Sequence, residues 1–429
     1  MVSRDSTNTP SLLLLPSPPA PPTSDAVRAA YRAPLAAVIS RLSEENKPNT
    51  HRGVAPVLAV AVASPVLTKS ATPEGENDVQ TADWARSQSL LAEVYSLVAS
   101  ICAETSIATD LEADDPGAVD VRLILVDHDP SSTAGYQPSL DGSHKANNTI
   151  VLDLAAFASL VQPWKRIFHP SSETGYQLQA TYLKYAEGKQ RLLQSQLVAV
   201  GGGLSLSKPT YSQETRQSNH SARSYTTVCL GGTFDHLHPG HKLFLHAAAL
   251  LLNLQDDSSG ESPQCELVIG ISSDELLAKK KYADQLQSWD VRSRCVINFL
   301  STLLSWSTTS ATKMKAVKAE TKELHAIFRD GAVLVRCVDF HDLYGPTVNQ
   351  KSIQALVVSG ETRSGGQAVN DKRHSQGWPL LDVYEIDVLD ANIDTMEGSK
   401  DNTPISSQFE SKISSTEIRK QKAERLSVL

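Results

Sequence analysis

The stretch VCLGGTFDHLHPGH, residues 228–241, decides the fold of the C-terminal half of this chain. Residues 228–230 suit a short buried strand, the two glycines that follow let the backbone approach a ligand closely, and the apolar-rich run 242–252 predicts a helix. His238 and His241 therefore stand at the start of that helix. A helix N-terminus carries unpaired N–H groups and a partial positive charge, so imidazoles placed there indicate a site for an anion whose charge grows during a reaction.

The spacing of the two histidines also allows two simpler interpretations. His-x-x-His can direct two imidazoles toward a metal ion, and a histidine in the first turn of a helix can be only a cap or a surface group. No third metal ligand stands nearby in the sequence, and Gly-Gly-Thr-Phe-Asp after a strand supplies a tight turn and donors where a nucleotide would lie. We therefore predict a phosphate site without a protein-bound metal.

These residues resemble the nucleotidylyltransferase superfamily, whose mark is Thr/His-x-Gly-His just after the first strand. The motif stands here as His238-Pro239-Gly240-His241. Together with Thr233-Phe234-Asp235 and four later segments, it looks most like the phosphopantetheine adenylyltransferase family of the eukaryotic and archaeal type. The resemblance covers roughly residues 225–429 and does not reach the first half of the chain.

A cluster of three lysines follows the next predicted strand, residues 266–271. In the family a lysine soon after this strand helps to hold the phosphate of the acceptor substrate, and an ammonium group suits phosphate without demanding one geometry. Of Lys279, Lys280 and Lys281 we favour Lys280 for this contact. Three consecutive lysines can equally form an ordinary solvated surface.

A third predicted strand, residues 355–359, runs into Gly360-Glu361-Thr362. The family usually carries a second Glu where this chain has Gly360, so the resemblance implies a role for Glu361 but none for position 360. Asn370 and Arg373 then match a family Asn-x-x-Arg in the following helix, although a polar helix face explains them without any function.

The string Ile-Ser-Ser-Thr-Glu-Ile-Arg, residues 413–419, lies near the end of the sequence. Ser414 or Ser415 alone would be explained as an ordinary N-cap ahead of a helix. In the superfamily the whole string closes over the phosphates of the nucleotide, with hydroxyls and helix N–H groups as donors and Arg419 assisting.

The resemblance implies that a phosphate oxygen of 4′-phosphopantetheine attacks the α-phosphorus of ATP, giving dephospho-coenzyme A and pyrophosphate. The nucleophile is already an anion, so positioning and charge stabilisation suffice without a general base. Mg²⁺ is expected to arrive with ATP. The implied catalytic residues are His238, His241, Thr233 and Lys280. The implied ATP-binding residues are Gly232, Thr233, Phe234, His238, Gly240, His241, Glu361, Ser414, Ser415, Thr416 and Arg419, and the implied phosphopantetheine-binding residues are Thr233, Lys280, Asn370 and Arg373.

Two other functions remain open at this point. One is a sister nucleotidylyltransferase with another acceptor, such as nicotinamide mononucleotide, or with CTP in place of ATP. The other is a non-catalytic scaffold in a coenzyme A-synthesising complex, and an association with other enzymes of coenzyme A biosynthesis is compatible with either an active or an inactive protein.

Composition excludes some classes of protein. The net charge of −8 argues against nucleic-acid affinity, and no run of about 18 apolar residues predicts a membrane span. The five cysteines are odd in number and lack close metal-type spacing, so we expect buried thiols in a reducing compartment, with the cytoplasm as the default location.

The pattern along the chain predicts an α/β protein with two folded domains. The C-terminal domain should be a Rossmann-like parallel sheet with strands near 226–230, 265–271, 332–338, 355–359 and 383–389, and the N-terminal domain a smaller α/β unit of unknown role with strands near 57–66 and 121–126. The predicted boundaries are a disordered proline-rich tail over 1–24, the N-terminal domain over 25–204, a linker over 205–224 and the catalytic domain over 225–429. Two long polar loops are expected at 255–264 and 391–412.

Overall fold

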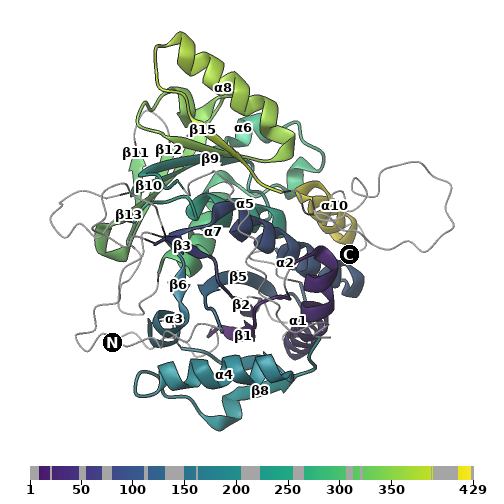
Figure 1. The fold of residues 1–429 in the computed structure, drawn as a ribbon. Coiled ribbons are helices and arrows are strands. Elements are labelled where there is room, and N and C mark those ends of the chain that lie inside the picture. Colours follow the sequence, from purple (N-terminus) through teal and green to yellow (C-terminus); the bar gives the residue numbers. More distant parts are fainter. Residues whose placement is uncertain are drawn as a thin grey trace.

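The computed structural model describes residues 9–19, 22–47, 55–69, 80–110, 115–130, 149–160, 163–203, 223–254, 265–305, 313–318, 322–387, 389 and 414–426. Two β-sheets organise these residues, one in the N-terminal domain (residues 9–203) and one in the C-terminal domain (residues 223–426) (Figure 1). Most of the predicted linker and both predicted polar loops lie outside the described residues.

The N-terminal sheet is entirely parallel, with the strand order β6-β5-β2-β1-β7-β8. Its strands are β1 Ser11–Leu15, β2 Val57–Ser64, β5 Asp120–Asp127, β6 Leu152–Asp153, β7 Ile167–Pro170 and β8 Leu197–Val200, and a separate antiparallel pair joins β3 Leu67–Lys69 to β4 Gln80–Ala82. The central strands are buried on both faces, which is why they read as continuous apolar runs without alternation.

The prediction of a disordered tail over residues 1–24 is wrong for Ser11–Leu15. These residues form β1 at the centre of the N-terminal sheet, between β2 and β7, and all five are buried. A serine followed by four leucines is too short for a helix, but these five residues are enough for a central parallel strand.

The C-terminal sheet has the order β11-β12-β13-β10-β9-β14-β15. Five parallel strands confirm the predicted Rossmann-like pattern: β9 Thr227–Gly232, β10 Cys265–Ser272, β13 Val333–Phe340, β14 Ala355–Val358 and β15 Asp382–Glu385. Two strands that the sequence analysis did not predict, β11 Lys313–Lys318 and β12 Lys322–Phe328, extend one edge in antiparallel fashion.

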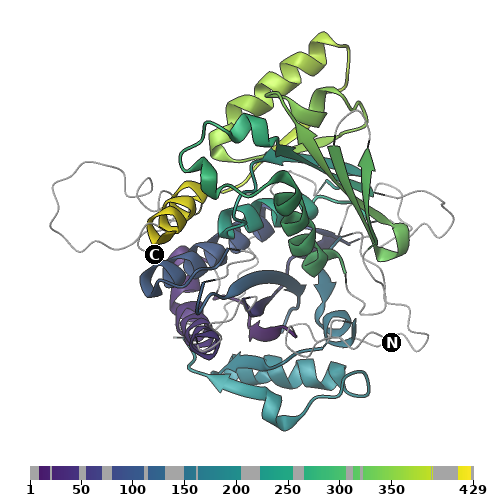
Figure 2. The same cartoon turned by 180° about the vertical axis from the view of Figure 1, so that it is seen from behind.

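The helices form three layers around the two sheets (Figures 1 and 2). Helices α3 Leu154–Leu160 and α4 Glu173–Ala186 cover the outer face of the N-terminal sheet, and α8 Arg363–Ser375 covers the outer face of the C-terminal sheet. Between the sheets lie α1 Ser24–Asn46, α2 Trp84–Thr105, α5 Pro239–Ala249 and α7 Trp289–Leu304. Shorter elements are α6 Asp274–Leu277 and the 3₁₀ turns η2 Gln194–Gln196, η3 Ala283–Gln285, η4 Arg329–Gly331, η5 Gly345–Val348 and η6 Gly360–Thr362, and α10 Ser415–Leu426 packs near the end of α2.

The middle layer belongs to both domains. Helix α2 of the N-terminal domain packs along α5 of the C-terminal domain, α7 reaches β5, and one continuous apolar cluster includes the facing sides of both sheets. The Trp84 indole Nε1 donates a hydrogen bond to the Ala247 carbonyl of α5 at 2.8 Å. The two domains therefore share one hydrophobic core between their sheets, in addition to the separate apolar cluster on the outer face of each sheet.

No helix in the described part of the chain combines the length and the apolar character that crossing a bilayer requires.

Candidate active site

The turn that follows β9 carries the histidine motif to the C-terminal edge of the parallel strands. His238 is the N-cap of α5 and Pro239 its first helical residue, a position where proline costs no hydrogen bond. Phe234 and His236 adopt left-handed backbone conformations, with φ of 51° and 46°. Such conformations are uncommon for residues other than glycine and persist only where neighbouring contacts fix them.

The imidazole rings of His238 and His241 stack on each other, with centroids 3.9 Å apart. Gly240 permits this approach, because a Cβ at that position would lie 3.2 Å from Cε1 of His238. The buried Nδ1 atoms of both rings have no hydrogen-bond partner among the described residues. Burial lowers the pKa of His238 to about 4 and that of His241 well below its usual value, so both rings are neutral at pH 7.

Phe234 supports the histidines from the interior. Its ring is fully buried and lies 5.4 Å from the His241 ring and 6.1 Å from the Phe244 ring. The structure therefore gives the Phe234 side chain a packing role beneath His241, in place of the nucleotide contact that the resemblance implies.

Asp235 ties the second motif to the first. Its carboxylate accepts a hydrogen bond from Nη1 of Arg419 at 2.5 Å and another from the Gln287 backbone N–H at 3.0 Å, and its carbonyl accepts one from the Ser415 hydroxyl at 2.8 Å. Asp235 is fully buried and Arg419 is 2% exposed. The start of α10 is thereby held against the histidine turn, as the predicted closure of the Ile-Ser-Ser-Thr string over a nucleotide requires.

The remaining residues of that string organise the first turn of α10. The Ser414 hydroxyl accepts a hydrogen bond from the Glu417 backbone N–H at 3.3 Å, which is the predicted cap. Thr416 accepts one from Arg419 Nη2 at 3.2 Å. Arg419 Nε also donates to the Lys281 carbonyl at 3.1 Å, so the lysine cluster that includes Lys280 lies beside α10.

Lys280 and Glu361 lie at opposite sides of this edge. Lys280 follows α6 with an exposed side chain, and its backbone N–H donates to the Leu277 carbonyl at 2.9 Å. Glu361 is exposed in η6, directly after β14. Because β10, β9 and β14 are adjacent and parallel, their carboxyl ends bring both residues to the edge that carries Gly232 and Thr233.

Arg292, which the sequence analysis did not single out, fixes Thr233. Its guanidinium is fully buried and donates to the carbonyls of Thr233 at 2.7 Å and Ser272 at 2.8 Å, and to the Asp274 carboxylate at 2.7 Å. It thus joins the carboxyl ends of β9 and β10. No local motif marked Arg292, whereas Asp235 stood in the Thr-Phe-Asp signature and could have been found there.

The predicted acceptor contacts of Asn370 and Arg373 do not fit the structure. All five N–H donors of Arg373 go to backbone carbonyls, those of Thr347, Gln350, Lys351, Ile353 and Pro379, and the side chain is fully buried. Asn370 exchanges two hydrogen bonds with the backbone of Leu381. Both residues hold the chain around α8 together, and this use of its donors leaves the Arg373 guanidinium none for an acceptor phosphate.

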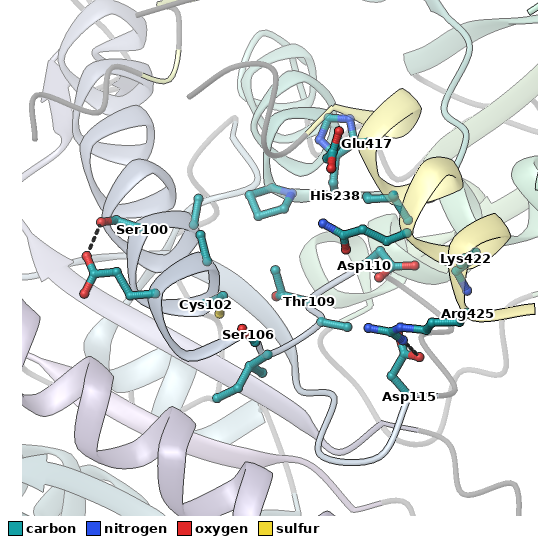
Figure 3. Close-up of a pocket in the computed structure, with 18 residues that line it drawn as sticks. Ser100, Cys102, Ser106, Thr109, Asp110, Asp115, His238, Glu417, Lys422 and Arg425 are labelled. Atoms are coloured by element: carbon teal, nitrogen blue, oxygen red, sulfur yellow. Dashed lines mark hydrogen bonds and ion pairs between the residues drawn. The ribbon is translucent and has the colours of Figure 1, made fainter. Parts of the chain in front are cut away.

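A cavity of about 530 Å³ lies between the end of α2, the segment 106–110 and α10, and it reaches His238 (Figure 3). Asp110 of the N-terminal domain and His238 stand on the wall of this same cavity. Both domains therefore border the histidine turn.

Comparison with known proteins gives each domain its own match. Residues 229–421 match a family model described as cytidylyltransferase-like, and residues 1–206 match a domain of unknown function, DUF8446. An uncharacterized protein of Schizosaccharomyces pombe is 34% identical over 198 residues, which cover 45% of this chain and 47% of that protein. A phosphopantetheine adenylyltransferase of Saccharomyces cerevisiae is 31% identical over 199 residues (46% and 49%), and one of Thermococcus kodakarensis is 26% identical over 167 residues (39% and 78%). The matches span about half the length of the two fungal relatives, and they confirm the resemblance to nucleotidylyltransferases.

Proposed function

We propose that this chain, whose residues 229–421 form a cytidylyltransferase-like domain, is a pantetheine-phosphate adenylyltransferase. It would transfer the adenylyl group of ATP to 4′-phosphopantetheine, giving dephospho-coenzyme A and pyrophosphate. The nucleotidyltransferase class rests on the family match, and the choice of substrates rests on relatives that carry the name phosphopantetheine adenylyltransferase.

One observation carries the proposal: Asp235 joins the Ser415 end of α10 to the turn that holds His238 and His241. The N-termini of α5 and α10 meet at this junction, together with two imidazole nitrogens that have no hydrogen-bond partner among the described residues, and this set of groups suits the triphosphate of ATP. Fixed donors of this kind stabilise the charge that develops on the α-phosphate and on pyrophosphate.

Thr233 and Lys280 are proposed to place the acceptor. The exposed ammonium of Lys280 would neutralise the phosphate of 4′-phosphopantetheine, while Arg292 holds the backbone of Thr233 in position. In this arrangement the phosphate oxygen attacks the α-phosphorus and pyrophosphate leaves on the opposite side.

Mg²⁺ is proposed to enter with ATP. The carboxylate of Asp235 is taken up by Arg419, and within the described ranges no three His, Cys, Asp or Glu side chains are grouped to hold a metal ion. When bound, Mg²⁺ supplies charge neutralisation to the polyphosphate and keeps part of its water.

The direct test is pyrophosphate release by the purified protein with ATP, Mg²⁺ and 4′-phosphopantetheine. We expect turnover with this pair, and none with nicotinamide mononucleotide as acceptor or with CTP as donor. Turnover with a different pair would assign the chain to a sister nucleotidylyltransferase, and no turnover with any pair would favour a non-catalytic scaffold. His241→Ala should lower kcat by about a hundred- to a thousandfold, and an unchanged kcat would remove His241 from the site.

A further inference from the structure

Two residues that flank the histidine motif are held by the N-terminal domain. Lys242 follows His241 directly, and His236 precedes His238 by two positions. Each contacts a carboxylate that lies more than a hundred residues earlier in the chain, Asp120 for Lys242 and Asp110 for His236. The four-residue motif is thus bracketed by the other domain.

Lys242 is anchored entirely in the N-terminal domain. Its side chain is fully buried, and its Nζ donates hydrogen bonds to Asp120 Oδ1 at 2.6 Å, to the Val121 carbonyl at 3.0 Å and to the Thr109 carbonyl at 3.1 Å. An ammonium group has three donors, and all three are used. A buried charge is tolerated only where its partners hold it in a good geometry, so the position of Lys242 is closely fixed.

The anchor is itself braced. Arg122 donates to Asp120 Oδ2 from Nη2 at 2.7 Å and from Nε at 2.9 Å, and it reaches across to the Thr302 hydroxyl of α7 at 2.7 Å. The carboxylate of Asp120 therefore stays in place between two cations, and the same group of side chains connects β5, α5 and α7.

The backbone of Lys242 also closes the first turn of α5. Its N–H donates to the His238 carbonyl at 3.0 Å, the first hydrogen bond of that helix. Fixing the Lys242 side chain from the N-terminal domain consequently fixes the turn that orients His238 and His241. A displacement of this turn would change where both imidazoles meet a phosphate oxygen.

The second contact supports the strained side of the turn. His236, in its left-handed conformation, has Nδ1 3.6 Å from Asp110 Oδ2, and its Nε2 lies 2.9 Å from the Gln285 carbonyl. Asp110 is only 4% exposed and His236 only 3% exposed. The Asp110 carboxylate thus faces Nδ1 of His236 at ion-pair distance, while the Gln285 carbonyl contacts Nε2 of the same ring.

We propose that the N-terminal domain is a positioning element of the active site, in which Asp120, through Lys242, and Asp110, through His236, set the orientation of His238 and His241. Neither carboxylate touches substrate in this role. This inference rests on the proposed function, because the effect of the positioning is measured on the rate of adenylyl transfer.

The test compares Lys242→Met with Arg336→Met in the full chain. Arg336 lies mid-strand in β13, two strands away from β9, and makes partly exposed ion pairs with Glu266 at 2.7 Å and Glu323 at 2.9 Å, so its loss reports general destabilisation. Under conditions where circular dichroism shows both variants folded, we expect Lys242→Met to lower kcat by about ten- to a hundredfold with an unchanged KM for phosphopantetheine. Arg336→Met should keep kcat within about twofold, since surface-side pairs away from the site act on stability alone.

A second readout does not depend on turnover. The imidazole ¹⁵N resonances of His238 and His241 should shift in Lys242→Met and stay unchanged in Arg336→Met. If wild-type protein releases no pyrophosphate, the proposed function fails while these spectra still test the positioning. Should Lys242→Met fail to fold, Asp110→Asn, which keeps the size of the side chain, takes its place in both measurements. A folded variant with the kcat and the imidazole spectrum of wild type would overturn the proposal.

Discussion

Arg419 and Asp235 meet as a buried ion pair at 2.5 Å, although 184 residues separate them in the sequence. This pair joins the two motifs on which the proposed nucleotide site depends. The Ser415 hydroxyl adds a second link to the same residue, at the Asp235 carbonyl.

Breaking this ion pair should lower both the free energy of unfolding and kcat, and the two effects can be measured separately. Asp235→Asn leaves the Arg419 guanidinium buried beside a neutral amide, so the free energy of unfolding should fall by about 3 to 5 kcal/mol. Below the melting temperature, kcat should fall by about a hundredfold as α10 loses its hold on the turn. Urea unfolding and pyrophosphate release measure the two effects, and wild-type kcat in a folded variant would contradict the coupling.

The two motif histidines should make the protein sensitive to acid. Burial lowers the pKa of His238 to about 4, whereas an unfolded histidine titrates near about 6.5. The unfolded chain therefore takes up protons first, so the stability linked to these neutral rings is complete above pH of about 6.5 and is lost as the pH falls toward about 4. Urea unfolding measured between those pH values should show that the free energy of unfolding of the double variant His238→Gln/His241→Gln falls less steeply with decreasing pH than that of wild type. Equal slopes for the two proteins would show that the rings are not held neutral.

Substitutions of Arg373 and Lys280 should have opposite effects, the first on stability alone and the second on the KM for phosphopantetheine alone. Arg373→Met leaves five backbone carbonyls, two of them in buried hydrogen bonds, without their donor, and the free energy of unfolding should fall by at least about 3 kcal/mol. Its KM for phosphopantetheine should stay at the wild-type value. Lys280→Met, at an exposed position, should change stability by less than about 0.5 kcal/mol and raise that KM about tenfold. A raised KM in folded Arg373→Met would restore it to the acceptor site.

The cysteines should be inert while the protein is folded. All five are free and buried, and burial raises the pKa of Cys102, Cys229 and Cys265 to about 12. Thiolates are the reactive form, so a thiol reagent at pH 8 should label native protein only as fast as it unfolds, and all five thiols at once in denaturant. Rapid labelling of one thiol in native protein would identify a residue that opens locally.

The shared core should make the two domains unfold together. Leu13 lies on β1 with no exposed surface, in the apolar cluster that spans both sheets. Leu13→Ala should cost about 2 to 5 kcal/mol, and the loss should appear equally in probes of the N-terminal domain and in the fluorescence of Trp289 on α7. Two separate transitions would mean that the domains fold independently.

Sequence patterns predicted those parts of the fold that local chemistry dictates. The strands of the C-terminal domain were found because buried parallel strands are apolar runs between polar residues, and the Asp235 turn was found because glycines and histidines mark it. β1 was missed, since five leucine-rich residues in a proline-rich context carry no periodicity. Arg373 was misassigned because a motif gives residue types and order, but it does not show which donors the backbone already uses.

The contacts between the domains could not have been predicted. Lys242 and Asp120 are 122 residues apart, and neither position differs in the sequence from an ordinary surface charge. Only folding shows that the two are buried against each other. The proposed positioning role of the N-terminal domain could therefore be inferred only from the three-dimensional structure.

The helical layer between the sheets also bears on what happens when the polypeptide is cut. A fragment ending at residue 203 and another beginning at residue 223 would each expose a large apolar surface. The two surfaces are complementary, because α2 and α5 pack against each other there. When the two fragments are produced together, they should associate without a peptide bond joining them. Either fragment produced alone should aggregate or be degraded.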